Sequence, residues 1–198
     1  PFSQKVVESN RLDQDWPSAE WLHARIEGQR LIGAVQRHLI EQLQASGFEA
    51  VAPSLHPQFA SWNRRPLHSR QGGTDYSSNW SERHVAHAAG LGTFGLSAAL
   101  ITSLGVAGRL GSVVTNLELP ATSLPYQVFD EYCLHCGVCA RNCRCLAISP
   151  GKGKKDKQIC SAFLEITRNR YRPRYGCGKC YVNVPCERIN PKAAGRRS

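Results

Sequence analysis

Apolar residues recur at helical spacing in the first quarter of the chain. They step by about three and four residues along one face of an amphipathic helix, at Leu31, Ile32, Val35, Leu39 and Leu43. Ser18 stands just after Pro17, where an N-cap is expected, and Gly47 is a natural helix stop. The pattern therefore predicts a helix that begins near Ser18 and ends before Gly47.

Two short segments alternate apolar residues with small or polar ones and predict β-strands. The first covers residues 48–52 and ends at Pro53, and the second covers residues 112–117. Residues 54–80 are polar and aromatic without a clear period, so we interpret them as a loop.

A short helix is predicted over residues 81–89, where Gly90 closes it. Gly90, Gly92 and Gly95 then form a glycine-rich turn, which would let the backbone cradle a phosphate or a planar cofactor. Glycines serve tight packing equally well, so these three are candidate cofactor-binding residues only. The alternation of helices and strands predicts an α/β or α+β region in residues 1–125, followed by a separate module in residues 126–198.

The composition changes sharply near residue 130. Residues 1–129 carry ten Lys or Arg and ten Asp or Glu, whereas residues 130–198 carry fifteen and five, so the whole formal charge of +10 lies there. All nine cysteines lie there too. Bound anionic clusters would compensate part of this charge, and the remainder would attract RNA or an acidic redox partner protein.

The cysteines begin with the run Cys133-x2-Cys136-x2-Cys139-x3-Cys143, which has the spacing of a bacterial ferredoxin. A cubane takes three thiolates from one tight loop, and two-residue gaps let successive sulfurs converge on it. The fourth cysteine of such a run ligates the other of two clusters. The run therefore predicts a second set of cysteines.

That second set is present in the last forty residues of the chain. Each set is expected to give one cysteine to the other set's cluster. The first [4Fe–4S] cluster is therefore predicted to bind Cys133, Cys136, Cys139 and Cys186. The second cluster is predicted to bind Cys143, Cys160, Cys177 and Cys180. Cys145 is left as a spare thiol with a structural role, and His135 is expected to pack or hydrogen-bond within the loop.

Other uses of cysteine fit this pattern less well. Disulfides are not expected, because the chain shows no secretory signal and nine is an odd count. Zinc ribbons also use Cys-x2-Cys, but as separate pairs around one tetrahedral ion, whereas here four cysteines follow one another in a single run at 2-2-3 spacing. Two departures from ferredoxins, Arg144 after Cys143 and Pro185 before Cys186, change the loops without removing a ligand.

Three further motifs accompany the cysteines, at residues 81–86, 89–95 and 111–115. With the double cysteine set, they make nearly the whole chain resemble epoxyqueuosine reductases and their iron–sulfur relatives, with reductive dehalogenases as more distant ones. The resemblance implies a nitroreductase-like, cobalamin-binding α/β region ahead of a ferredoxin-like module with two clusters. It also implies that electrons pass through the clusters to a corrinoid, which reduces the epoxide of a modified tRNA base.

The resemblance makes cobalamin a candidate cofactor, with residues 81–116 contributing to its pocket, and makes tRNA a candidate partner for the basic C-terminal third. The enzymes carry an aspartate proton donor shortly before the Glu-Arg pair, whereas Asp75 lies seven residues before Glu82. The second cysteine set also departs from the enzymes, with a five-residue gap before Cys186 where they usually have three.

Neighbouring polar residues are expected to have structural roles. His84 and His87 are predicted to lie at the surface or in satisfied core positions, and Glu82 and Arg83 to form structural hydrogen bonds at a helix start.

Three functions therefore stay open: an electron-transfer protein, a corrinoid-dependent reductase, and a nucleic-acid-binding module with structural clusters. No apolar run reaches the roughly 20 residues of a membrane helix, and the first residues lack the features of a signal peptide. We therefore expect a cytoplasmic protein with no membrane partner. Because the sequence lacks methionine, we expect that Pro1 is not the natural start of the chain.

Overall fold

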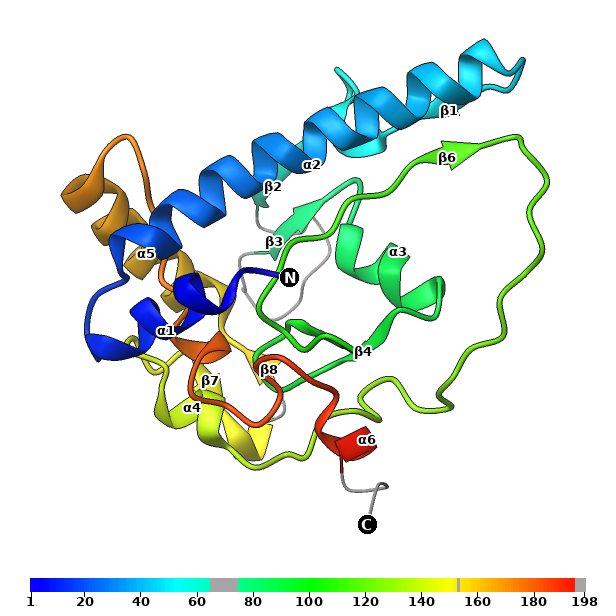
Figure 1. Ribbon diagram of the computed structural model, residues 1–198. Helices are drawn as coiled ribbons and strands as arrows, with labels where there is room; N and C mark the ends of the chain where they lie inside the picture. Colours follow the sequence, from blue (N-terminus) through cyan, green and yellow to red (C-terminus); the bar gives the residue numbers. More distant parts are fainter. Residues whose placement is uncertain (65–74, 153, 195–198) are drawn as a thin grey trace.

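One long helix, α2 (Ala19–Ala45), runs along one side of the molecule in the computed structural model, which describes residues 1–64, 75–152 and 154–194 (Figure 1). The Ser18 hydroxyl accepts a hydrogen bond from the backbone N–H of Trp21 at 3.1 Å. Beyond the other end of the helix, Gly47 has a φ of +86°, a conformation that favours glycine. The predicted beginning and end of this helix are confirmed.

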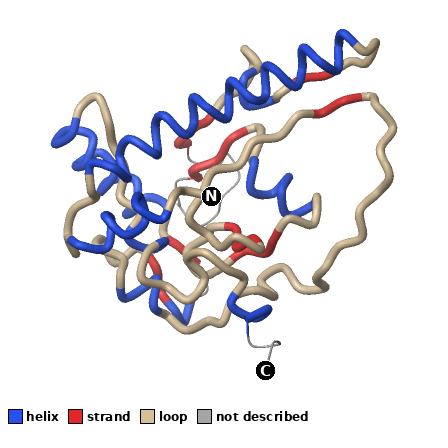
Figure 2. The backbone as a smooth tube through the Cα atoms, viewed as in Figure 1, coloured by secondary structure: helices blue, strands red, loops and turns tan. Residues whose placement is uncertain are grey.

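The other helices are shorter, and loops connect most of them (Figure 2). They are α1 (Gln4–Leu12), α3 (Glu82–Ala88), α4 (Val138–Arg141), α5 (Lys157–Tyr171) and α6 (Pro191–Ala194). Single 3₁₀ turns are η1 (Pro53–Leu55), η2 (Pro150–Lys152) and η3 (Lys179–Tyr181). The short helix predicted over residues 81–89 is confirmed as α3, whereas α1 and α5 were not predicted.

The strands pair two by two, and every pair is antiparallel. They are β1 (Ala50–Val51) with β6 (Val114–Thr115), β2 (Ser61–Arg64) with β3 (Asp75–Ser78), β4 (Gly92–Phe94) with β5 (Leu100–Thr102), and β7 (Ile148–Ser149) with β8 (Lys154–Lys155). The two strands predicted from alternation are β1 and β6, and Ala50 lies opposite Thr115. Helices mixed with small sheets are compatible with the predicted α+β class.

The interpretation of residues 54–80 as a loop is wrong in part, because β2 and β3 form an antiparallel ladder there. Ser61 lies opposite Ser78 in this ladder. At its base the Asn79 side chain accepts from the backbone N–H of Ala60 at 2.9 Å and donates to the carbonyl of Gln58 at 2.7 Å. The Asn79 side chain thus joins the base of a ladder whose strands lack the apolar alternation from which strands are predicted.

The predicted apolar face of α2 is exposed over much of its length. Leu31, Val35 and Leu39 are 65%, 58% and 45% exposed. The helix instead buries Gln36, whose amide donates to the backbone carbonyl of Ser112 at 2.9 Å. The buried side of α2 is therefore formed by Trp21 and Leu22 near its start and by Gly33 and Gln36 farther along, and not by the predicted stripe.

Cysteines form a large part of the buried core. Cys133, Cys143 and Cys180 belong to one buried cluster with residues of the preceding region, Leu96 and Ile101. Residues on the two sides of position 125, where two domains were predicted to meet, thus share one cluster. The packing of the cysteine module and that of the glycine-containing strands therefore depend on each other.

The strand β4 requires a glycine at its first position. A Cβ added to Gly92 would lie 2.1 Å from the backbone oxygen of Ile101 on β5, and a paired backbone has no room to shift. We expect Gly92→Ala to lower the free energy of unfolding by about 3 kcal/mol, measured by denaturant titration. Gly151→Ala is the control, because nothing lies within 4 Å of its added Cβ. Equal stability of the two variants would contradict this role.

Candidate metal centre

The first predicted cysteine set lines one small cavity. Cys133, Cys136 and Cys139 come from the loop and helix around α4, and Cys186 reaches the same cavity from beyond η3. Apolar side chains of Leu96, Ile101 and Val184 complete the wall. Three cysteines from one loop and a fourth from a distant segment are thus brought together as the ferredoxin spacing predicts.

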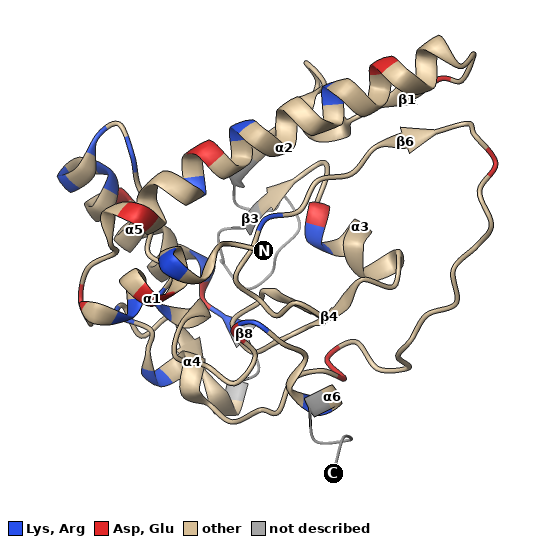
Figure 3. Cartoon of the chain, viewed as in Figure 1, with Lys and Arg blue, Asp and Glu red and all other residues tan. Residues whose placement is uncertain are grey.

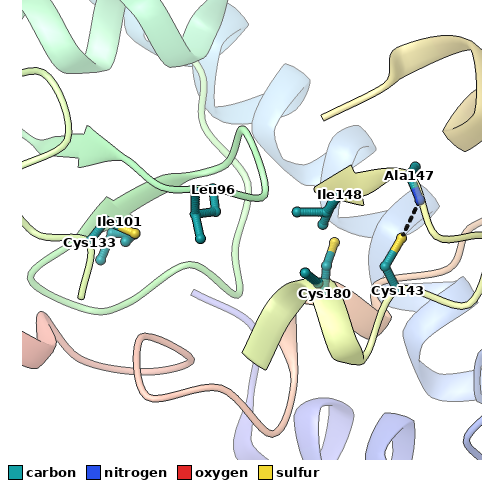
Figure 4. Packing of buried hydrophobic residues seen from close by; sticks show 8 residues of the cluster. Leu96, Ile101, Cys133, Cys143, Ala147, Ile148 and Cys180 are labelled. Atoms are coloured by element: carbon teal, nitrogen blue, oxygen red, sulfur yellow. Dashed lines mark hydrogen bonds between the residues drawn. The ribbon is translucent and has the colours of Figure 1, made fainter. Parts of the chain in front are cut away.

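The second predicted set lines a separate and larger cavity of about 680 Å³. Cys160 faces it from α5, Cys177 and Cys180 from η3 and the residues before it, and Cys143 from the end of the ferredoxin-like run. Cys145 joins them, with its sulfur 3.8 Å from that of Cys143. Figure 4 shows Cys143 and Cys180 near each other and Cys133 apart, beyond Leu96.

Backbone N–H groups point at sulfurs of both sets. The N–H of His135 donates to Cys133 Sγ at 3.4 Å, and the N–H of Ala147 donates to Cys143 Sγ at 3.3 Å (Figure 4). The first contact depends on a tight loop in which His135 has a φ of +51° and Gly137 a φ of +72°. Such N–H donors stabilise thiolate charge and tune a cluster held by the sulfurs.

The thiols occupy apolar, crowded surroundings. Burial, helped by the neighbouring thiols, raises the pKa of Cys186 to about 12. Burial also raises the pKa of Cys180 to about 12, although the charge of Lys155 acts in the opposite direction. Isolated thiolates are therefore disfavoured at these positions, and only cations bound among them would hold all the sulfurs deprotonated.

Two ammonium groups lie beside the second set. Lys155 on β8 donates to Cys180 Sγ at 3.9 Å. Burial alone lowers the pKa of Lys155, but Cys180, Tyr181 and Cys160 outweigh it and raise that pKa overall. Lys179 lies between Cys177 and Cys180 and is only 4% exposed. Figure 3 shows basic residues on α1, α4, α5 and β8, around this part of the molecule.

Lys179 attaches α1 to the second cysteine set. Its ammonium donates to the carbonyl oxygens of Asn10 and Asp13, each at 2.7 Å, and to Asn10 Oδ1 at 3.3 Å. The side-chain amide of Asn10 in turn donates to the carbonyl of Cys177 at 3.1 Å. A helix far away in the sequence is thereby joined by hydrogen bonds to Cys177 and Lys179.

Lys179→Met should detach this helix. The substitution keeps the length of the side chain but removes three hydrogen bonds, two of them to acceptors of the buried Asn10, which costs about 3 kcal/mol. We expect a lower free energy of unfolding and faster amide hydrogen exchange in residues 4–12. Lys5→Met is the control, because Lys5 is exposed on the same helix. Unchanged exchange in α1 would show that the ammonium does not hold it.

The larger cavity also contains polar side chains from the region before the cysteines. Both carboxylate oxygens of Glu82 are buried and have no hydrogen-bond partner within the described residues, and the same holds for Arg109 Nε. Arg83, in contrast, donates to the carbonyl of Ala98. The expected structural hydrogen bond is thus formed by Arg83 and is not found for Glu82 within the described residues.

The histidines occupy the structural positions that were expected. His87 Nδ1 lies 2.8 Å from the carbonyl oxygen of Gly92, and its ring stacks on Tyr126. His84 contacts the hydroxyl of Ser81 at 2.7 Å, and burial lowers its pKa. His135 pairs with Asp130 at 2.9 Å. Asp75 begins β3, and its side chain lies outside the described part of the structure.

The three candidate glycines do not form one cradle. Gly90 packs against Pro125, and Gly92 belongs to the β4–β5 ladder. Gly95 lines the cavity of the first cysteine set, where an added Cβ would lie 3.7 Å from Cys133 Sγ. Among them only Gly95 is placed beside a predicted cofactor, and that cofactor is a cluster.

Sequence reasoning missed Lys155, Lys179 and Asn10. The only sequence clue was the position of Lys179 between two predicted ligands.

Within the described residues, no three His, Cys, Asp or Glu side chains are placed around a single metal ion. A cubane spreads its four thiolates over four irons, so its ligand sulfurs stand farther apart than those of one ion.

No helix in the described residues is both long and apolar enough to cross a membrane.

The chain was compared with protein families, with curated proteins and with solved structures, and none of the three comparisons found a match.

Proposed function

We propose that this chain is an iron–sulfur redox protein that binds two [4Fe–4S] clusters and transfers electrons between them. The observation that supports this most is the exchange of cysteines between two cavities. Cys186 lies with the first three cysteines of the run, whereas Cys143 lies with Cys160, Cys177 and Cys180. This interleaving is the arrangement of a two-cluster ferredoxin, and a set of disulfides would not need it.

The residues fit two cubanes in number, chemistry and surroundings. The smaller cavity offers four thiols and the larger one offers four with Cys145 as a fifth, and each cavity receives a backbone N–H donor at a sulfur. The clusters would supply one-electron redox chemistry when bound. The protein's own part is to hold their ligands, exclude water and set the charge around them.

The first set provides a surface for a redox partner protein. Cys136 is exposed, and the neighbouring Leu134 is 46% exposed, so a partner would approach this cluster closely. The basic charge of the C-terminal third favours a partner with an acidic surface. Free thiols and Fe–S ligation both fit the reducing cytoplasm.

The composition of the purified protein tests this proposal. Anaerobically purified protein should contain about eight irons per chain and an equal amount of acid-labile sulfide. Its broad visible absorption should be bleached by dithionite, and the reduced protein should give an electron paramagnetic resonance signal of interacting clusters. Zinc in place of iron would contradict the proposal.

A second candidate function is a cobalamin-dependent reductase that acts on a modified tRNA base, as the resemblance to epoxyqueuosine reductases implies. The cavity of about 680 Å³ beside the second set favours it, as does the Glu82 carboxylate, which has no hydrogen-bond partner in the part of the chain that the structure describes, because such a cavity suits an organic ligand. Reconstitution with cobalamin should then add corrinoid absorption bands at a ratio near one. Salt-dependent tRNA binding without those bands would favour a binding module with structural clusters.

A further inference from the structure

The two cysteine sets differ in the charged groups that surround them. Two ammonium groups lie beside the second set, that of Lys179, which is buried, and that of Lys155, which is partly buried. Lys179 also lies beside a ligand, Cys177, but it is partly compensated, because the carbonyl oxygens of Asn10 and Asp13 accept from its ammonium at 2.7 Å each. Lys155 donates directly to a predicted ligand, with its ammonium 3.9 Å from Cys180 Sγ. Of these two ammonium groups, Lys155 is thus the one that hydrogen-bonds to a ligand sulfur within the described residues.

The first set has no comparable buried cation among the described residues. The groups that act on Cys139 and Cys186 are other thiols and backbone N–H groups. Arg141 and Arg188 lie nearby in the sequence but are exposed. His135 and Asp130 pair with each other at the surface. Water and salt screen such exposed charges.

Charge is the main difference left between the two environments. Within the described residues, a backbone N–H donates to Cys133 Sγ at 3.4 Å and another to Cys143 Sγ at 3.3 Å, so these two contacts are alike in the two sets. Solvent at Cys136 favours reduction of the first cluster to some degree. A cation inside the protein acts with less screening than solvent, and it stabilises the extra electron of a reduced cluster.

We propose that Lys155 holds the second cluster at a higher reduction potential than the first. Electrons that enter through the exposed side of the first cluster then move to the second and remain beside the large cavity, which contains Glu82. This inference rests on the proposed function, because it requires both clusters.

Potentiometric titration of the full chain, followed by electron paramagnetic resonance, tests the proposal. The variants are Lys155→Met, which removes the charge, and Lys155→Arg, which keeps it, with Lys5→Met as an exposed control. We expect Lys155→Met to disfavour reduction of the second cluster at least tenfold, or about 59 mV for one electron. The first cluster should shift much less, and Lys155→Arg and Lys5→Met should resemble the wild type.

The assignment of potentials in the wild type provides a second test that needs no Lys155 variant. Cys180→Ser should perturb the signal of higher potential and Cys139→Ser the signal of lower potential. Equal potentials, the reverse assignment, or a Lys155→Met variant with both clusters and unchanged potentials would overturn the inference. A protein without iron would instead refute the proposed function, so the two failures are distinguishable.

Discussion

Cys186→Ala should remove one cluster and leave the other. Cys186 is separated from Cys139 by more than forty residues, yet it lies in the same cavity. Besides burial, the neighbouring thiols of Cys139, Cys133 and Cys136 raise its pKa. Without it the first cluster loses its fourth thiolate, while the second keeps all of its own. We expect iron to fall from about eight to about four per chain, with the spectrum of one isolated cluster.

Two matched variants make this result specific. Cys143→Ala should also leave about four irons, although the cluster that it removes is the other one. Cys145→Ala should keep about eight, because Cys145 is the fifth thiol of its set and lies 3.8 Å from Cys143. Magnetic interaction between clusters should disappear in Cys186→Ala and Cys143→Ala and persist in Cys145→Ala. Retention of full iron by Cys186→Ala would show that the sets are assigned wrongly.

The sequence predicted those features that depend on local chemistry. Ser18 and Gly47 bound α2 because an N-cap hydroxyl and a positive φ act within one turn of the helix end. The sorting of cysteines into two sets also followed from spacing, because the geometry of a short loop decides which sulfurs converge.

Features that depend on distant contacts were not predictable in the same way. The exposed stripe of α2 has the right period, but the partner of Gln36 is Ser112, seventy-six residues away. Lys155 reaches Cys180 across twenty-five residues, and Lys179 reaches Asn10 across 169. Surface lysines and buried ones look alike in a sequence, since only tertiary packing determines which of them loses its water.

These contacts change how the cysteine module should be understood. α1 is attached to the second set through Lys179 and Asn10, and Leu96 and Ile101 pack with cysteines of both sets. A ferredoxin-like module that stands alone would need neither contact. The clusters are therefore expected to be part of the core that holds the N-terminal region in place, as well as carriers of electrons.

Removal of iron should unfold the protein. Three of the cysteines are buried members of the central cluster of side chains, and four more pack against it. Without iron no metal links the crowded thiols, and the end of the cavity of about 680 Å³ that the second cluster would occupy is left empty. Because ligand binding and folding share one free energy, we expect stability to fall by more than about 5 kcal/mol, enough to unfold an ordinary domain.

Anaerobic treatment with an oxidant and a chelator, followed by circular dichroism and thermal melting, measures this effect. The treated protein should lose its near-ultraviolet signal and its cooperative transition, and amide protection in α1 should disappear. Addition of iron, sulfide and a thiol reductant should restore all three. The Cys186→Ala variant, which keeps the cluster next to Lys179, should melt between the two states. A treated protein that melts like the untreated one would show that the side chains alone form the core and that the clusters only carry electrons.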